Sequence, residues 1–390
     1  MPRTQLLLAA MATAVIAVPC VSAQQDVAFT TTNFIFPTSS SDEVLVGESG
    51  DVDPTDLPGS DLGSFLDVLP PGLVFPWDID YHAASDKFFA VGAGSDNDTA
   101  PPSREFHFND SGTIWSFDRD GSNPKLLASG LNFPQHLDVS SDGGTVYFAE
   151  QGAGVGNDFQ DNGRIGRLDV SSGAVETVVT APASAGPTGV HYDPSSNSIF
   201  YQVNNRGPSS NIDIQQIRRV SADTTEGAAS SDELWLENPT PSDGVLDSGE
   251  EFTVLSAGRN LQVHDGFVYF TYRNSNFTPN SEIRRLPIDF DLDSDDPTSF
   301  ETVIGPGSGS VRIIDFEIIG DHIYWTDPQS PIPGVFRSNL DGTEVTQVAA
   351  KFTSSSLPIG VAVVPEPGML LLTGVLAGGV MMRRPRRRTA

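Results

Sequence analysis

Carboxylates and imidazoles recur at regular intervals along this chain, each inside a short apolar segment typical of a β-strand. At one equivalent position, successive segments carry Asp80, Asp138, His191, His264 and Asp315. Two residues earlier, the same segments carry Asp78, His136, Gly189, Gln262 and Ile313. If the segments converge, these oxygen and nitrogen ligands could hold Ca²⁺ or another divalent cation. The alternative interpretation is structural, with the same side chains accepting hydrogen bonds from backbone donors at strand ends.

The segments belong to an internal repeat, which is the element that must position these side chains. The clearest copy runs from Asp321 to Ala349 and reads as two strands, an Asp341-Gly342 turn and a third strand. An Asp-Gly pair between alternating segments is a strong hairpin signal. Similar copies begin at Lys87, Gly144, Ser198 and Gly266. With the preceding segment, each copy supplies four strands, so the chain is typical of a repeat architecture.

Five complete repeats are followed by an unpartnered sixth opening strand, Leu357–Val363. We expect its partners to come from the N-terminus, at Val44–Gly47, Asp51–Asp53 and Phe65–Leu69, because a ring closed by both termini has no free edge. The sequence therefore predicts an all-β protein, a six-bladed β-propeller over residues 44–364. Residues 24–43 are expected to form an N-terminal arm, in which residues 26–43 are a lead strand or an arm that packs on the outside.

The phrase Tyr324-Trp325-Thr326-Asp327, with its Asp341-Gly342 turn, resembles the YWTD repeats of LDL-receptor-like propellers. It is also similar to the wider set of six-bladed propellers with NHL and gluconolactonase members. In two other copies Phe148 and Phe270 replace the Trp. The resemblance implies the fold, whereas a family's function does not follow from its fold. Gluconolactonase-like propellers hold an axial metal with Glu, Asn and Asp, whereas the axial set expected here has His and no Glu.

Residues 1–23 are predicted to be a signal peptide. Arg3 precedes an apolar segment, Leu6–Val18, and Val21-Ser22-Ala23 is a small-residue cleavage site. The only cysteine, Cys20, lies inside this segment. Cleavage after Ala23 would leave a chain with no disulfide, no thiolate metal ligand and no cysteine nucleophile.

Residues 365–390 have three parts: Pro365-Glu366-Pro367, an apolar segment from Gly368 to Met382, and a cluster of arginines that begins with Arg383 and Arg384. This tail resembles the PEP-CTERM sorting signal of bacterial exported proteins. The resemblance implies a short hydrophobic helix that contacts the membrane and an exosortase-type protease that removes it. It also implies export through the inner membrane to the cell envelope or the exterior. The alternative is a lone C-terminal transmembrane anchor, although the 15-residue apolar segment is shorter than the roughly 20 residues that span a bilayer.

The net charge and the missing catalytic motifs exclude several classes of function. The chain has 22 basic and 51 acidic residues, a formal net charge of −29, which opposes nucleic-acid binding because phosphate backbones are repelled. No nucleophile elbow, zinc-protease helix, phosphate loop or dinucleotide fingerprint is present in the sequence. We expect a binding or scaffold protein for extracellular polysaccharide, matrix or protein partners. The alternative is a metal-dependent lactonase or lyase that acts at the axial site.

Overall fold

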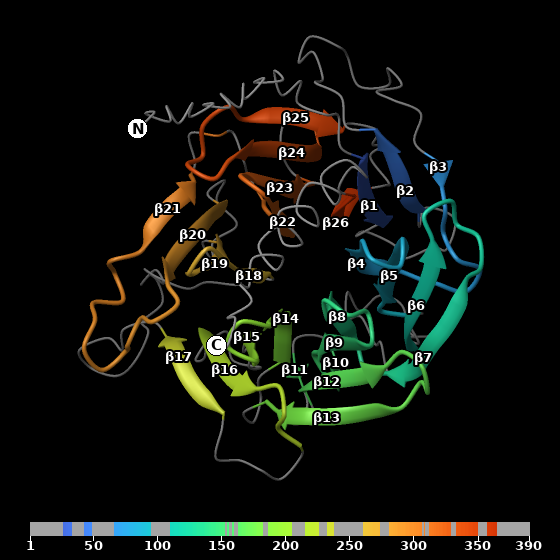
Figure 1. Ribbon diagram of the computed structural model, residues 1–390, viewed down its shortest axis with the longest axis horizontal. Coiled ribbons are helices and arrows are strands. Elements are labelled where there is room, and N and C mark those ends of the chain that lie inside the picture. Colours follow the sequence, from blue (N-terminus) through green and yellow to red (C-terminus); the bar gives the residue numbers. More distant parts are fainter. Residues whose placement is uncertain are drawn as a thin grey trace, which may run out of the picture.

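The computed structural model describes residues 26–32, 43–48, 66–94, 110–152, 154–155, 158–159, 163–181, 186–204, 215–225, 232–237, 260–273, 281–305, 308, 312–328, 333–349 and 357–364. Within these residues, six four-stranded antiparallel sheets stand around a central axis like the blades of a propeller (Figure 1). The predicted all-β, six-bladed fold is confirmed.

The first three complete blades follow one another along the chain, each running from the axis outward. Blade 1 contains β4 (Pro76–His82), β5 (Lys87–Gly92), β6 (Gly112–Asp118) and β7 (Lys125–Leu131). Blade 2 contains β8 (Pro134–Val139), β9 (Thr145–Glu150), β12 (Arg164–Asp169) and β13 (Val175–Thr180). A small hairpin, β10 (Gly154–Val155) and β11 (Asp158–Phe159), lies between β9 and β12 in the sequence. Blade 3 contains β14 (Gly186–Asp193), β15 (Ser198–Asn204), β16 (Gln215–Ser221) and β17 (Glu233–Glu237).

Two further blades complete the internal repeat. Blade 4 contains β18 (Leu261–His264), β19 (Phe267–Arg273), β20 (Ser281–Pro287) and β21 (Glu301–Ile304). Blade 5 contains β22 (Phe316–Ile319), β23 (His322–Asp327), β24 (Gly334–Asn339) and β25 (Thr346–Ala349). The innermost strands β4, β8, β14, β18 and β22 face the axis (Figure 1).

The sixth blade is built from both ends of the chain, as predicted. Its order is β26 (Leu357–Val364), β1 (Asp26–Thr32), β2 (Glu43–Glu48) and β3 (Leu66–Asp67). The first strand of the chain therefore pairs directly with the last strand described, with Val27 opposite Val363. This pairing completes the sixth blade and closes the ring.

The predicted outer arm is wrong at β1, because this segment is the second strand of the shared blade. Val27 and Phe29 pack with Tyr324 of blade 5, while Ala28 packs with Phe88 of blade 1. Both faces of β1 are thus buried, and Thr30 and Thr31 are covered as well. The expected partner at residues 51–53 lies outside the described residues, and β1 takes the place next to β26.

The hydrophobic core lies between neighbouring blades, where the second strands contribute large side chains. Phe148, Phe270 and Trp325 occupy the same position of three blades, and all three are fully buried. The aromatic substitutions within the repeat therefore preserve the packing. Gly166 gives Phe148 its room, since a Cβ there would lie 2.2 Å from the ring.

Candidate functional site

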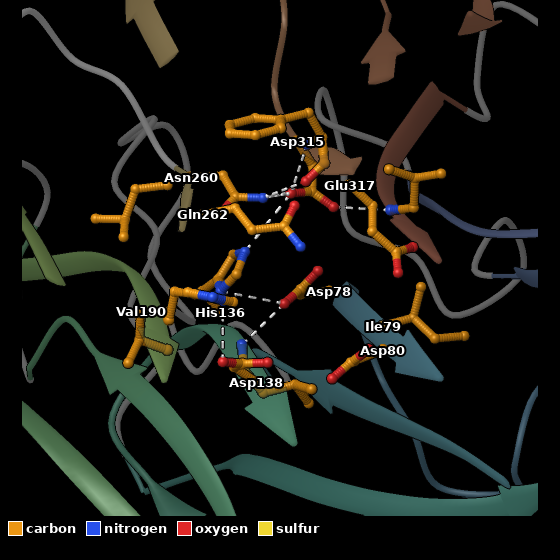
Figure 2. A pocket seen from close by; sticks show the side chains of 15 residues that line it. Asp78, Ile79, Asp80, His136, Asp138, Val190, Asn260, Gln262, Asp315 and Glu317 are labelled. Atoms are coloured by element: carbon orange, nitrogen blue, oxygen red, sulfur yellow. Dashed lines mark hydrogen bonds and ion pairs between the residues drawn. The ribbon is translucent and has the colours of Figure 1, made fainter. Parts of the chain in front are cut away.

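Polar side chains from the innermost strands, and from the residues just before them, line a cavity on the axis of the propeller (Figure 2). The cavity has about 370 Å³ of space, part of which is open solvent. Its polar lining is Asp78, Asp80, His136, Asp138, His191, Asn260, Gln262, Asp315 and Glu317.

These side chains form two layers, which can be assigned by strand register. In each blade, one axial residue pairs with an aromatic residue of the second strand. Asp80 pairs with Phe89, Asp138 with Tyr147, His191 with Phe200, Gln262 with Tyr269, and Glu317 with Tyr324. We call these five axial residues the Asp80 layer. The residues two positions earlier, Asp78, His136, Gly189, Asn260 and Asp315, form the Asp78 layer.

The predicted alignment of the layers is wrong in blades 4 and 5. It placed His264 and Asp315 beside Asp80, whereas the register places Gln262 and Glu317 there. The cause is turn length: His264 and Phe267 are joined by a two-residue turn, Asp265-Gly266, with φ of 46° and 79°. The same hairpin in blade 1 is two residues longer, from His82 to Lys87. The expectation that the axis carries no Glu is therefore also wrong.

His264 does not line the cavity, because it stands at the end of β18 beside the turn. Its Nε2 lies 3.5 Å from the Oδ2 of Asp265, an exposed carboxylate. The structure thus brings Asp80, Asp138, His191 and Asp315 to the axial cavity and leaves the fifth predicted ligand at the hairpin. Metal binding by the predicted set stays a prediction.

Axial side chains of blades 1, 2, 4 and 5 accept hydrogen bonds from the following blade, as the structural interpretation expects. Neighbouring innermost strands belong to different sheets, so their facing N–H groups need acceptors from elsewhere. The acceptor comes from the preceding blade: Asp78 for Leu137 N–H (2.8 Å), Asp80 for Val139 N–H (2.9 Å), Asp138 for Tyr192 N–H, Gln262 for Ile318 N–H (2.7 Å), Asp315 for Val361 N–H (2.8 Å) and Glu317 for Val363 N–H.

Two acids of the Asp80 layer have raised pKa values. Burial raises the pKa of Asp80 to about 6, and the charge of Asp138 adds to the rise. Burial also raises the pKa of Glu317 well above its ordinary value, with a further contribution from Asp80. On the opposite side, His191 Nδ1 lies 3.1 Å from Asp138 Oδ2.

In the Asp78 layer, one imidazole lies between two carboxylates. His136 Nδ1 is 3.6 Å from Asp78 Oδ2, and its Nε2 is 3.6 Å from Asp315 Oδ1. Burial alone would lower the pKa of His136, but Asp78 and Asp315 outweigh it and raise that pKa to about 9. Burial raises the pKa of Asp78 well above its ordinary value, and the charge of Asp315 adds to this. One potential ligand atom from each of the three residues lies within 4.8 Å of the others.

The sequence did not reveal two lining residues of this cavity, Asn260 and Glu317, and it placed a third, Gln262, in the wrong layer. Asn260 comes one residue before β18, and its uncharged side chain gave no signal. Aligning the copies on their aromatic second strands, instead of on their first strands, would have found all three.

Comparison with known structures supports the fold. A solved structure titled as a nidogen/laminin complex matches with a TM-score of 0.54 at 10% identity, over 87% of this chain and 98% of that chain. TolB from Acinetobacter baumannii matches with a TM-score of 0.48 at 14% identity, over 88% of this chain and 67% of that chain. At 10% identity, the likeness to the first of these structures shows the fold alone. It agrees with the six-bladed propeller expected from the Tyr324–Asp327 phrase.

No protein-family model matches the chain, and a search of curated proteins finds no match. The predicted signal peptide, residues 1–23, and the predicted sorting tail, with Pro365, Glu366, Pro367, Arg383 and Arg384, lie outside the described residues. Among the residues that are described, no helix has the length and apolar character needed to cross a membrane.

Proposed function

We propose that this protein is an exported β-propeller that binds a protein partner in the cell envelope or outside the cell, with no catalysis of its own. The observation that carries the proposal is the use of the axial carboxylates. Asp78, Asp80 and Glu317 each accept a backbone N–H from the next blade, so they hold the ring together. A rigid closed ring is a suitable scaffold for binding loops. The fold's similarity to a propeller solved in the nidogen/laminin complex supports a protein partner over polysaccharide or matrix.

Saturable binding would test this function. Residues 24–364, immobilised through one end, should bind a defined secreted protein of the host saturably. The same chain in solution should compete for this partner. The matched control is the same chain with Phe29→Ala, which weakens the ring while leaving the exposed residues intact. Retention on host polysaccharide alone would reassign the partner class, and lactone turnover would replace the binding role with an enzymatic one.

We further propose that the tail directs sorting at the membrane. The order Pro365-Glu366-Pro367, apolar segment, Arg383 and Arg384 supports recognition by an exosortase-type protease. Mass spectrometry of protein purified from its own host should find chains that lack Arg383 and all later residues. Chains that end at Ala390 would favour a permanent anchor instead.

A metal-dependent lactonase or lyase is the second candidate. It is favoured by the grouping of Asp78, His136 and Asp315 beside an open cavity. Turnover of a lactone or a uronic-acid polymer that chelator abolishes and added metal restores would favour this role. Absence of turnover in metal-loaded protein would remove it.

A further inference from the structure

We propose that the Asp78 layer binds a divalent transition-metal cation, Zn²⁺ or Mn²⁺, through Asp78, His136 and Asp315, with the side-chain oxygen of Asn260 as a fourth donor. This site differs from the one the sequence predicted, since only Asp315 is common to both. It also goes beyond the proposed binding function, because a propeller can bind a protein partner without a metal.

The three side chains lie close enough to share one cation after a small adjustment. Metal–ligand bonds to nitrogen and oxygen are about 2.0–2.2 Å long, so two ligands of one ion lie roughly 3–4.3 Å apart. One ligand atom from each of Asp78, His136 and Asp315 lies within 4.8 Å of the others. The two carboxylates face opposite nitrogens of the imidazole, each at 3.6 Å. One ring nitrogen can therefore bind the ion while the other faces a carboxylate, as is usual for metal-binding histidines.

Asn260 provides an independent indication of a ligand. Its side chain is buried, with the residue only 4% exposed. The amide Nδ2 donates to the Asp315 carboxylate and to the carbonyl oxygen of Phe316, 2.7 Å away. Both partners are acceptors, so the orientation of the amide is fixed and Oδ1 faces elsewhere. Among the described residues this Oδ1 has no hydrogen-bond partner, and buried polar atoms of that kind call for one.

Asn260, which carries this oxygen, is one of the residues that line the axial cavity. Asn260 lines the same axial cavity as Asp78, His136 and Asp315, and Figure 2 shows it beside Asp315 on the side that faces His136. The Nδ1 of His136 likewise has no hydrogen-bond partner. Within the described part of the chain, two buried polar atoms without hydrogen bonds therefore belong to residues that line one polar cavity, where a cation could bind them together with the carboxylates.

Charge and donor type select the ion. Asp78 and Asp315 bring two carboxylates to one imidazole, and Asp80, Asp138 and Glu317 add further acid to the same cavity. The surroundings therefore favour a cation. Ca²⁺ and Mg²⁺ prefer oxygen ligands throughout, whereas a mixed set with an imidazole suits Zn²⁺ or Mn²⁺.

Two positions of the Asp78 layer are glycines and supply no ligand. Gly189 occupies the equivalent position in blade 3, and Gly360 of β26 lies against β4. A Cβ at Gly360 would stand 2.8 Å from the Cα of Asp78 and 3.0 Å from the carbonyl oxygen of Trp77. The absence of a side chain at Gly360 thus allows β26 to approach the strand that carries Asp78.

Calorimetric titration of the untagged, chelator-treated chain with ZnCl₂, MnCl₂ and CaCl₂ tests the site. We expect one Zn²⁺ or Mn²⁺ per chain, bound more tightly than Ca²⁺. His136→Gln should weaken binding by at least about 100-fold, since even outer-shell changes cost 10–100-fold. His191→Gln is the matched control, because it alters the other imidazole of the same cavity. Asn260→Leu should weaken binding by about tenfold or more.

A measurement on the unaltered chain covers the case in which His136→Gln does not fold. Zn²⁺ should shift the side-chain NMR signals of one histidine, identified as His136 by elimination, with each of the other five of the six histidines replaced by Gln in turn. Equal affinity in His136→Gln and wild type, or loss of binding in His191→Gln alone, would overturn the proposal. So would the absence of any saturable binding. Partner binding measured in chelator would be unaffected by these outcomes, so the two proposals fail separately.

Discussion

Asp80 of blade 1 reaches across to blade 2, where its Oδ2 accepts a 2.9 Å hydrogen bond from the backbone N–H of Val139. The next blade repeats the arrangement, with Asp138 accepting from Tyr192 N–H. The innermost strands share no sheet, so these side chains perform between blades the role that backbone pairing performs within them. The first role of these acidic residues near the axis is therefore to stabilise the contacts between blades.

Asp80→Ala should lower the free energy of unfolding by roughly 1–3 kcal/mol, because the Val139 N–H loses its acceptor inside the protein. Asp80→Asn is the matched variant, since its side-chain oxygen can accept the same bond, and it should lose less. Urea denaturation at neutral pH compares the two. Equal losses in both variants would mean that this hydrogen bond does not stabilise the contact between blades.

Phe29→Ala should destabilise the protein by about 3–5 kcal/mol, the usual cost of deleting a large buried side chain. Phe29 is fully buried in β1 and packs against blade 5. Leu126→Ala is the control, because Leu126 is 46% exposed and should change stability by about 0.5 kcal/mol or less. Thermal melts measure both. A melting temperature unchanged by Phe29→Ala would contradict the place of β1 in the shared blade.

Gly360→Ala should destabilise the ring where β26 meets β4. The added Cβ would be 2.8 Å from the Asp78 Cα, and backbone cannot yield as a flexible side chain can. We expect a loss of about 1–3 kcal/mol, typical of overpacking. Gly305→Ala is the control, since its nearest contact would be a Thr302 methyl group at 3.3 Å. Denaturation curves that coincide for the two variants would show that the close approach is relieved without cost.

Asp169 should titrate at low pH. Hydrogen bonds from the Ser171 hydroxyl and from Ser172 lower its pKa from 3.8 to about 2. A depressed folded pKa means that the stabilisation is present above pH 4 and is lost as the pH falls toward 2. NMR titration of the Asp169 carboxyl should find this value, and Ser172→Ala should raise it. A pKa near 4 in both proteins would mean that the turn does not hold the carboxylate in solution.

The repeat was sufficient to predict the fold, because every blade must bury the same aromatic second strand. The ring closure followed from one unpartnered strand, Leu357–Val363. The place of β1 was not predictable, since a Thr-rich segment looks solvent-exposed until its neighbours cover both faces.

The axial site was only partly predictable, for a geometric reason. Side-chain types at the axis can be read from a repeat only if its turns have constant length. The two-residue turn at Asp265-Gly266 moves β18 by two positions relative to its partner. A shift of two keeps each side chain on its face and so leaves the hydrophobic pattern unchanged. The pattern alone could not reveal that Gln262, and not His264, faces the cavity.

In the shared blade, Asp26 pairs with Val364. The first residue of β1 and the last residue of β26 are therefore neighbours in the sixth blade. In the sequence, each is close to a proposed processing segment, the signal peptide that ends at Ala23 and the tail that begins at Pro365. β1 gains its inner neighbour only when β26, the final strand described, has been synthesised and has reached it. Under the proposed export, the ring therefore closes only after both β1 and β26 have reached the same side of the membrane.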